Sequence, residues 1–240
     1  MTESIIIIDF GSQVTKLIAR RIREFGVFSQ IVPFNKVTKK LLGNNSVKGI
    51  IFSGGPKSVH EKNSPKIDDY IYELEIPILG ICYGLQLIAK QFGGKIIPSR
   101  DREFGKTKIK LTKKSPLLEN VIFPNKPVQV WMSHSDKISI IPDSFEKIAS
   151  SDNCEFAVIQ NQKKKIYGVQ FHPEVVHTIG GTKILKNFIR NICGCSAKWN
   201  MKFFKKKIIE DIKMQVGKHK VICGLSGGVD STVTAALINS

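Results

Sequence analysis

The chain has 240 residues, of which 42% are hydrophobic, so it is long enough for one large domain, or one and a half, with an ordinary core. Its formal net charge is +17, but lysines in scattered short runs supply most of the positive charge, which argues against specific nucleic-acid binding and leaves weak nonspecific binding open. Five cysteines without a CxxC pair indicate no disulfide framework or zinc site, and with no signal peptide or apolar run of bilayer length we expect a reducing, cytoplasmic setting.

The first part of the chain alternates apolar runs with amphipathic segments, which predicts a sheet of parallel strands with helices between them. We expect strands at residues 4–9, 27–32 and 48–52, and helices at residues 14–25 and about 36–42. The third strand leads into Ser53-Gly54-Gly55-Pro56. Two glycines at the carboxyl end of a strand let backbone N–H groups approach a ligand closely, although a plain tight turn is the alternative.

A sharp turn from a strand into a helix is predicted at Gly80-Ile81-Cys82-Tyr83-Gly84. Residues 76–79 are typical of a buried strand, and residues 85–92 carry apolar side chains at helical spacing. A cysteine at such an elbow lies at a helix N-terminus, which favours the thiolate, and the N–H of Tyr83 is left facing any oxyanion that forms there. The alternative is a buried core cysteine, the usual place of a free thiol.

A base for this cysteine is available at the end of a later strand. Residues 165–171 form an apolar run that leads into His172-Pro173-Glu174. The imidazole of His172 is suited to deprotonate Cys82 and later to protonate a leaving group, and Glu174 is suited to hold the imidazole in the right tautomer. His177 is the competing base, but it lies beyond Glu174 and away from the strand end.

These two motifs, Gly80-Ile81-Cys82-Tyr83-Gly84-Leu85-Gln86 and His172-Pro173-Glu174, resemble the class I, or triad, glutamine amidotransferases. The resemblance covers about residues 4–192. That family hydrolyses the side-chain amide of glutamine through a cysteinyl thioester and passes ammonia to a second active site. The resemblance implies no cofactor or metal for this half, and it implies these roles: Cys82 as nucleophile, His172 as base, Glu174 as its orienting carboxylate, the N–H groups of Gly55 and Tyr83 as oxyanion hole, and Gln86 as a glutamine contact.

We therefore expect residues 1–195 to form an α/β domain of the class I glutamine amidotransferase type. This is a flavodoxin-like, three-layer fold with a mixed central sheet, helices on both faces and the triad at the carboxyl ends of strands. Short alternating strands are predicted over residues 95–148, a strand at residues 154–160, a helix at 182–192 and a linker at 193–200. Met132-Ser133-His134-Ser135-Asp136 resembles a substrate-side loop of those amidotransferases that synthesise GMP, with Ser135 where the pattern usually has glycine.

The last forty residues carry a second signature. A basic amphipathic helix at residues 201–216 and a strand at 219–225 precede a glycine-rich loop, with a helix expected from Thr232. Such a loop presents N–H groups to phosphate, and the lysine of a Walker A loop is missing. The loop resembles the pyrophosphate loop of the ATP pyrophosphatases, although a glycine turn with an N-cap serine is the alternative. The resemblance implies contacts with ATP or pyrophosphate by Ser226, Gly227, Gly228, Val229, Asp230 and Ser231.

Together the two signatures resemble the amidotransferases that make GMP. For such a full-length enzyme this implies glutamine, XMP and ATP with Mg²⁺ as substrates, a homodimer, and no membrane or specific nucleic-acid partner. Because the chain ends soon after Ser231, we expect residues 201–240 to be the truncated start of an ATP pyrophosphatase domain, poorly anchored by itself. Three alternatives stay open: an amidotransferase serving another synthase, a cysteine peptidase or related hydrolase, and an inactive binding module. The glycine-rich loop argues against the first two.

Overall fold

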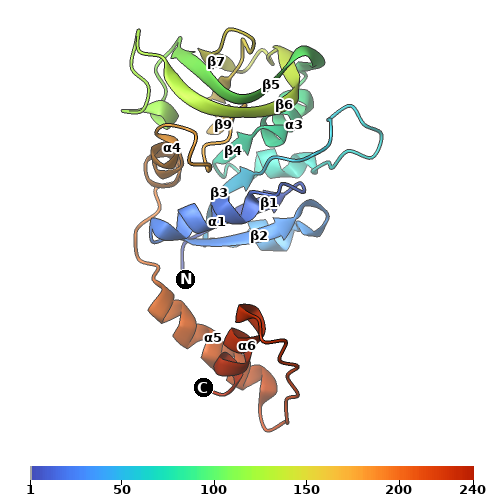
Figure 1. Ribbon diagram of the computed structural model, residues 1–240, viewed down its shortest axis with the longest axis vertical. Helices are drawn as coiled ribbons and strands as arrows, with labels where there is room; N and C mark the ends of the chain where they lie inside the picture. Colours follow the sequence, from blue (N-terminus) through green and yellow to red (C-terminus); the bar gives the residue numbers. More distant parts are fainter. Residues whose placement is uncertain (1) are drawn as a thin grey trace. The chain divides into compact units, whose positions relative to one another are not determined.

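The computed structural model describes residues 2–240, except for the side chains of residues 100–102, 203 and 207. The chain divides into two compact units, Met1–Ala197 and Lys198–Ser240. All strands of the described residues belong to the first unit, together with the helices α1 to α4 (Figure 1). The second unit contains the helices α5 and α6.

The first unit is built on a mixed sheet of nine strands in the order β2-β1-β3-β4-β9-β8-β7-β5-β6. The run from β2 to β9 is parallel, and the pairs from β9 to β6 are antiparallel. This confirms the predicted mixed sheet. The bounds are β1 Ser4–Asp9, β2 Phe28–Pro33, β3 Val47–Phe52, β4 Ile78–Ile81, β5 Lys95–Leu111, β6 Val128–Ile140, β7 Glu146–Ser150, β8 Val158–Asn161 and β9 Ile166–Val169.

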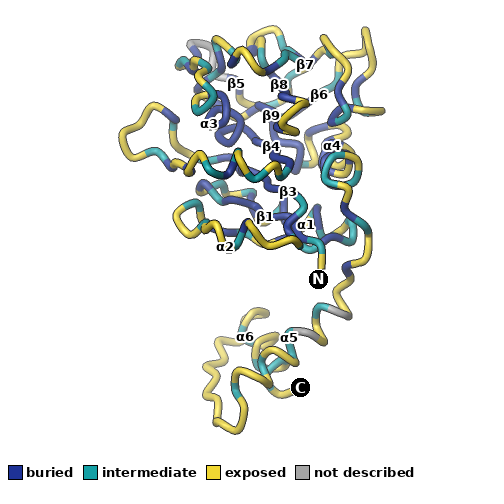
Figure 2. Tube along the Cα trace, turned by 180° about the vertical axis from the view of Figure 1, so that it is seen from behind, coloured by how far each residue is buried: buried dark blue, intermediate teal, exposed yellow. Residues whose placement is uncertain are grey.

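Helices cover both faces of the parallel part of the sheet because its strands are apolar on both sides. In β1, Ile5 and Ile7 pack in one core with α1 (Thr15–Glu24) and α4 (Gly181–Asn187). Ile6 and Ile8 point the other way, into a second core with α3 (Tyr83–Gln91) and α2 (Lys39–Leu42). Successive side chains of a strand alternate between faces, so an unbroken isoleucine run fills two cores. Figure 2 shows the strands running through this buried interior.

The segment of Met132-Ser133-His134-Ser135-Asp136 is part of strand β6 rather than a loop. Its residues pair with β5 in an antiparallel ladder, in which His134 lies opposite Glu103. Ser135 is not among the residues with positive φ, so the backbone there does not require the glycine that the sequence pattern favours. Two other bounds also differ from the prediction. Strand β8 begins at Val158 rather than at residue 154, and α4 ends in a π-helical turn, Phe188–Ile192.

The second unit contains α5 (Met201–Val216) and α6 (Val229–Ile238), and most of its residues are exposed (Figure 2). The strand predicted at residues 219–225 is wrong: these residues are exposed and irregular. A strand needs a neighbour to satisfy its backbone N–H and C=O groups, and the described residues of this unit offer none. Helix α6 begins at Val229 rather than Thr232, so Val229, Asp230 and Ser231 form its first turn.

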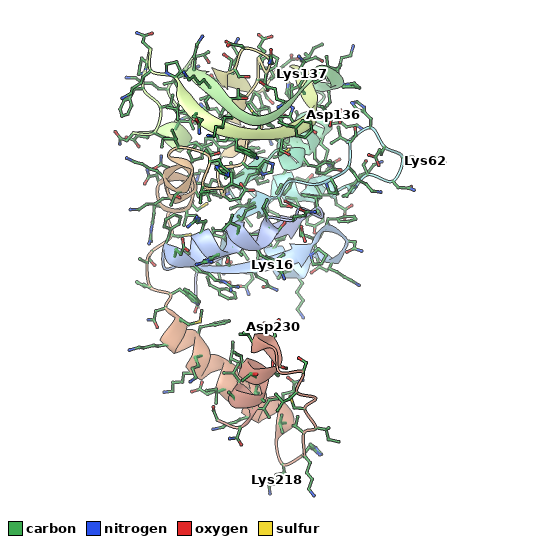
Figure 3. All side chains as sticks on the ribbon, viewed as in Figure 1. Lys16, Lys62, Asp136, Lys137, Lys218 and Asp230 are labelled. Carbon is green, nitrogen blue, oxygen red and sulfur yellow. The ribbon has the colours of Figure 1, made fainter. Side chains whose placement is uncertain are left out.

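The positive charge of the first unit is spread over its surface. Figure 3 shows Lys16, Lys62 and Lys137 on three separate parts, respectively helix α1, the segment between β3 and β4, and strand β6. No helix among the described residues is long and apolar enough to cross a membrane.

Candidate active site

Cys82 lies on a strained turn between β4 and α3. Its backbone has φ 50° and ψ −105°, a conformation that residues other than glycine rarely adopt. The turn is held on both sides: the N–H of Cys82 donates to the carbonyl of Val169 at 2.8 Å, and its carbonyl accepts from the N–H of Gln86 at 3.1 Å. The sequence-predicted elbow is therefore present, and the strain persists because the sheet and the helix both fix it.

Two glycines make this turn possible. Neither has a positive φ; both are needed because a side chain would not fit. A Cβ on Gly80 would lie 2.7 Å from the backbone of Gly84 and Leu85, because the first turn of α3 folds back onto β4. A Cβ on Gly84 would lie 2.5 Å from the carbonyl oxygen of Phe52 in β3. Contacts this short are incompatible with a side chain, so both positions need glycine for close packing.

The sheet brings the predicted residues together. Strands β3, β4 and β9 are neighbours and run parallel, so the segments after them, which carry Gly54, Cys82 and His172, meet at one edge. A Cβ on Gly54 would lie 3.1 Å from Cε1 of His172 and 3.8 Å from Cβ of Cys82. Next to it, a Cβ on Gly55 would lie 2.9 Å from the Phe10 carbonyl oxygen. The glycines leave the space in which these side chains approach each other.

His172 and Glu174 form a buried pair. Nδ1 of His172 lies 2.8 Å from Oε1 of Glu174, whose residue is only 1% exposed. The backbone around the histidine is fixed to the sheet: its N–H donates to the Trp131 carbonyl at 3.0 Å, and the Thr178 hydroxyl donates to its carbonyl at 2.6 Å. The second oxygen of Glu174 has no hydrogen-bond partner within the described structure. The imidazole of His172 is thus the hydrogen-bond partner of this buried carboxylate.

The pKa of His172 is raised to about 10. Burial alone would lower this pKa, but a hydrogen bond with the Cys82 side chain and the hydrogen bond and charge of Glu174 outweigh the loss of water. The raised pKa favours the protonated imidazole at neutral pH, and this ring is hydrogen-bonded to the Cys82 side chain. Such a pair supplies both a nucleophile and a proton donor.

His177 does not take this place. It is exposed and packs against the Trp131 ring, with the two ring centroids 4.6 Å apart. Of these two histidines, His172 is the one whose side chain the structure brings to Cys82.

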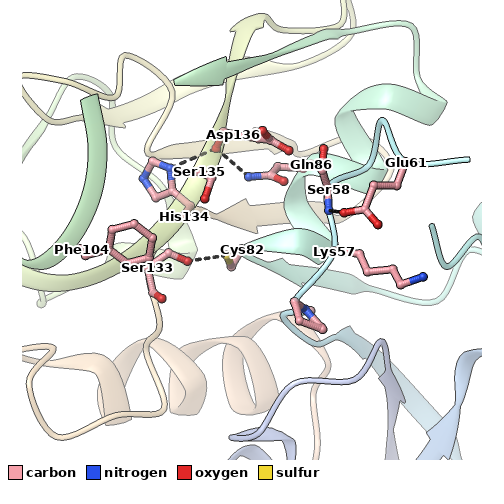
Figure 4. Close-up of a pocket in the computed structure, with 12 residues that line it drawn as sticks. Lys57, Ser58, Glu61, Cys82, Gln86, Phe104, Ser133, His134, Ser135 and Asp136 are labelled. Atoms are coloured by element: carbon pink, nitrogen blue, oxygen red, sulfur yellow. Dashed lines mark hydrogen bonds between the residues drawn. The ribbon is translucent and has the colours of Figure 1, made fainter. Parts of the chain in front are cut away.

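A cavity of about 450 Å³ opens beside Cys82 (Figure 4). Its walls combine the segment after β3 with α3 and β6, including Gly55, Gln86 and Asp136. The Nε2 of Gln86 donates to the Asp136 carbonyl at 2.8 Å and to Oε1 of Gln170 at 3.2 Å. Both of these bonds use Nε2, so neither occupies the remaining polar atom, the acceptor Oε1. Tyr83, the first residue of α3, has no acceptor for its N–H within the helix.

One group of described side chains has the composition of a metal site. The ligand atoms of Glu103, His134 and Cys154 all lie within 4.8 Å of one another and are buried. His134 already has partners on both ring nitrogens: Nε2 lies 3.2 Å from Glu103 Oε2, and Nδ1 lies 3.0 Å from the Asp136 carbonyl oxygen. Burial, and the nearby Glu103 charge, raise the pKa of Cys154 to about 12, so its thiol is a poor ligand at neutral pH. Glu103 and His134 are thus already hydrogen-bonded to other protein groups.

The glycine-rich loop of the second unit is stabilised by its own hydroxyl groups. The hydroxyls of Ser226 and Ser231 lie 3.1 Å apart, and that of Ser231 donates to the Gly228 carbonyl at 3.0 Å. Gly227 has φ +79°, and Gly228 is the N-cap of α6. The exposed N-terminus of a ten-residue helix thus follows the loop directly.

The family described as glutamine amidotransferase class-I matches residues 6–192. The chain belongs to this family. The match covers the sheet except for the first two residues of β1, and it covers every element that lines the cavity beside Cys82, while the second unit lies outside it.

Similar proteins agree with this assignment. Proteins named glutamine-hydrolysing GMP synthase from Caldanaerobacter subterraneus and Campylobacter hominis are 47% and 51% identical over 237 and 235 residues. These alignments cover 99% and 98% of this chain but 46% and 45% of the relatives, so the chain spans about half the length of the curated relatives it matches.

Solved structures show the same fold. A Thermoplasma acidophilum protein, provisionally described as a GMP synthase subunit, has 35% identity and a TM-score of 0.69, covering 81% of this chain and 95% of that one. A glutamine amidotransferase from Thermotoga maritima has 18% identity and a TM-score of 0.60 over 99% and 95% of the two chains, which supports the fold alone.

The contacts of three residues at the site were not predicted from the sequence: Gly54 was considered only as part of the glycine turn after the third strand, and Gln170 and Glu103 were not singled out. Gly54 lies against His172, Gln170 lies against Cys82, and Glu103 holds His134. Alternation along the strand end was a usable signal for Gln170, because a residue two positions before His172 points to the same side. Glu103 had no such signal, since its partner depends on the register of β5 against β6.

Proposed function

We propose that this chain is the glutamine-hydrolysing part of a GMP synthase. The observation that carries the proposal is the strained Cys82 elbow, with the His172–Glu174 pair delivered by the adjacent parallel strand. The names of the relatives, at about half identity over nearly the whole chain, support GMP synthesis as the purpose of the ammonia. In that reaction XMP, ATP and glutamine become GMP, AMP, pyrophosphate and glutamate.

In the proposed mechanism, glutamine binds in the cavity beside Cys82, with Gln86 contacting it. The sulfur attacks the side-chain amide carbon, and the N–H groups of Gly55 and Tyr83 stabilise the oxyanion. The protonated His172 donates its proton to the leaving nitrogen, so ammonia departs and a thioester remains on Cys82. His172 then takes a proton from water, which attacks the thioester and releases glutamate. Glu174 keeps the imidazole oriented and stabilises its charge throughout.

The second unit is proposed to supply the pyrophosphate loop of the nucleotide-binding half. The domain assignment would then be residues 1–195 for the glutaminase and 201–240 for the start of an ATP pyrophosphatase domain. The loop from Ser226 to Ser231, with Gly228 capping α6, has the backbone N–H groups and positive helix end that suit the phosphates of ATP with Mg²⁺. We also propose a cytoplasmic, homodimeric full-length enzyme, as the sequence resemblance implies.

Glutamate release from glutamine tests the glutaminase proposal, with purified chain and with a separately produced nucleotide domain added. Cys82→Ala should abolish hydrolysis, because no other thiol stands at an elbow. His172→Ala should lower kcat about 10²–10⁴-fold, the usual contribution of a general acid–base group, and Glu174→Ala should cost less because water partly replaces an orienting carboxylate.

His177→Ala is the matched control, because this histidine is exposed and lies against Trp131. Its activity should stay within roughly twofold of the unmodified chain, as for most surface substitutions. If His177→Ala proved more damaging than His172→Ala, the assignment of the base would be wrong.

A further inference from the structure

Gln170 is a buried glutamine that touches the sulfur of Cys82. Its residue is 0% exposed, and its Nε2 lies 3.6 Å from Cys82 Sγ, within hydrogen-bonding distance for sulfur. Its other polar atom, Oε1, accepts from Gln86 Nε2 at 3.2 Å. The side chain thus joins the candidate nucleophile to the wall of the cavity.

The hydrogen-bond partners of this amide determine which of its two polar atoms faces the sulfur. The Asp136 carbonyl can only accept hydrogen bonds, so the group of Gln86 that faces it at 2.8 Å must be Nε2. The same Nε2 faces Gln170, so the Gln170 atom on that side must be the acceptor Oε1. The N–H group of Gln170 is therefore the one directed at Cys82.

The carbonyl that fixes this orientation is itself held firmly. It also accepts from Nδ1 of His134 at 3.0 Å, and the other nitrogen of that ring lies 3.2 Å from Glu103. Glu103 in turn accepts from the Ser151 hydroxyl at 3.2 Å. These links form one buried hydrogen-bond chain from β5 through β6 and α3 to the sulfur, so a flip of the Gln170 amide would break several bonds at once.

The direction of the N–H matters because Cys82 has two states. As a thiol it donates a hydrogen bond to the Ser133 carbonyl at 3.5 Å. A thiolate has no proton to donate, so its negative charge and the carbonyl oxygen repel each other. An N–H donated to the sulfur favours the thiolate. We propose that Gln170 is a further residue of the catalytic site, one that stabilises the Cys82 thiolate by a hydrogen bond whose direction Gln86 and Asp136 enforce. The inference rests on the proposed role of Cys82 as nucleophile.

Other ionisable groups also surround this sulfur and will contribute to its titration. His172 pairs with it directly and Glu174 stands behind that ring, while the Cys154 thiol interacts with it electrostatically. The remaining groups line the cavity or back its wall: Lys57 and Glu61 from the segment after β3, Asp136 and His134 from β6, and Glu103 from β5. Each of these stays unchanged in the variants that follow.

The test measures the rate of Cys82 alkylation by iodoacetamide as a function of pH, with the labelled peptide identified by mass spectrometry. Gln170→Met keeps the length of the side chain and removes the donor. It should raise the pH midpoint of alkylation by about one unit, so that the rate at pH values below both midpoints falls about tenfold. Gln170→Glu keeps the acceptor for Gln86 but directs an oxygen at the sulfur, and should raise the midpoint at least as much.

Gln160→Met is the matched control, because Gln160 is also buried on a neighbouring strand but bonds Ser115 and Glu146 away from the site. It should lower thermal stability without moving the midpoint. If the Gln170 variants lose stability but keep the unmodified midpoint, the glutamine is only structural and the inference is overturned. A Cys82 that iodoacetamide does not label at any pH at which the chain stays folded would instead overturn the proposed function.

Discussion

The protonated state of His172 governs the site at the scale of single residues. Glu174 and the Cys82 sulfur together hold the proton on the imidazole, although the residue is largely buried. A folded state that binds a proton more tightly than the unfolded chain is stabilised by that proton. The protein therefore enters its proposed reaction with the leaving-group proton already in place, and the same proton links catalysis to stability.

This linkage predicts a pH dependence of stability. The pKa of His172 rises from 6.5 to about 10 on folding, so its contribution is complete below pH 6.5 and is lost as the pH rises toward 10. His172→Gln cannot bind the proton, and its melting temperature should therefore fall less over this range. Thermal melts of both proteins at half-unit steps measure the difference. Parallel profiles from pH 6.5 to 10 would contradict the raised pKa.

The elbow depends, at the scale of elements, on how closely α3 packs against β3 and β4. Gly84→Ala would place a methyl group against the Phe52 carbonyl, so α3 must shift away from the sheet. Overpacking of this kind costs about 1–3 kcal/mol, and we expect it to displace Cys82 as well, with at least a tenfold loss of glutamine hydrolysis.

Gly93→Ala is the control at the other end of the same helix. A Cβ there would meet nothing within 4 Å, but φ is +90°, so only backbone strain of about 1–2 kcal/mol is added. Chemical denaturation should show that both variants are less stable than the unmodified chain. Glutamate release, corrected for the fraction of folded protein, should be lowered only in Gly84→Ala. Equal impairment would mean that general stability, rather than the elbow, limits activity.

Local sequence patterns predict those elements whose structure is determined by residues close together in the chain. The isoleucine run of β1, the glycines around Cys82 and the histidine at the end of an apolar strand each predict their own position, and the sheet then brings them together. Contacts that depend on strand register are beyond such patterns: Met132-Ser133-His134-Ser135-Asp136 is predicted as a loop but lies in β6, because β5 pairs with it. The strand expected at residues 219–225 fails for the opposite reason, since apolar residues alone form no strand without a neighbour.

The two units differ, at the scale of the whole molecule, in how much they bury. The first has two hydrophobic cores, one on each face of its sheet, whereas no described residue from Met201 onward is buried. Adenine and ribose need an enclosed, largely apolar pocket, and an exposed loop before one helix offers only phosphate contacts. We therefore expect this 240-residue chain to make no GMP from XMP, ATP and Mg²⁺, even with ammonia supplied.

Chromatographic detection of GMP in that mixture is the check, with ammonium chloride present and glutamine absent. Adding a separately produced nucleotide domain provides the positive control. GMP formation by the chain alone would show that the second unit is sufficient for nucleotide chemistry.

Cys82 is proposed to attack the side-chain amide carbon of a glutamine bound in the cavity beside it. The most direct measurement is mass spectrometry of the intact and digested chain after reaction with a glutamine-analogue alkylator, with and without excess glutamine. We expect one adduct per chain, located on Cys82 and suppressed by glutamine. The buried thiols of Cys154 and Cys195 and the exposed thiol of Cys223 should stay unmodified. Equal labelling of Cys154 or Cys223, or labelling of Cys82 that glutamine does not suppress, would contradict this proposal.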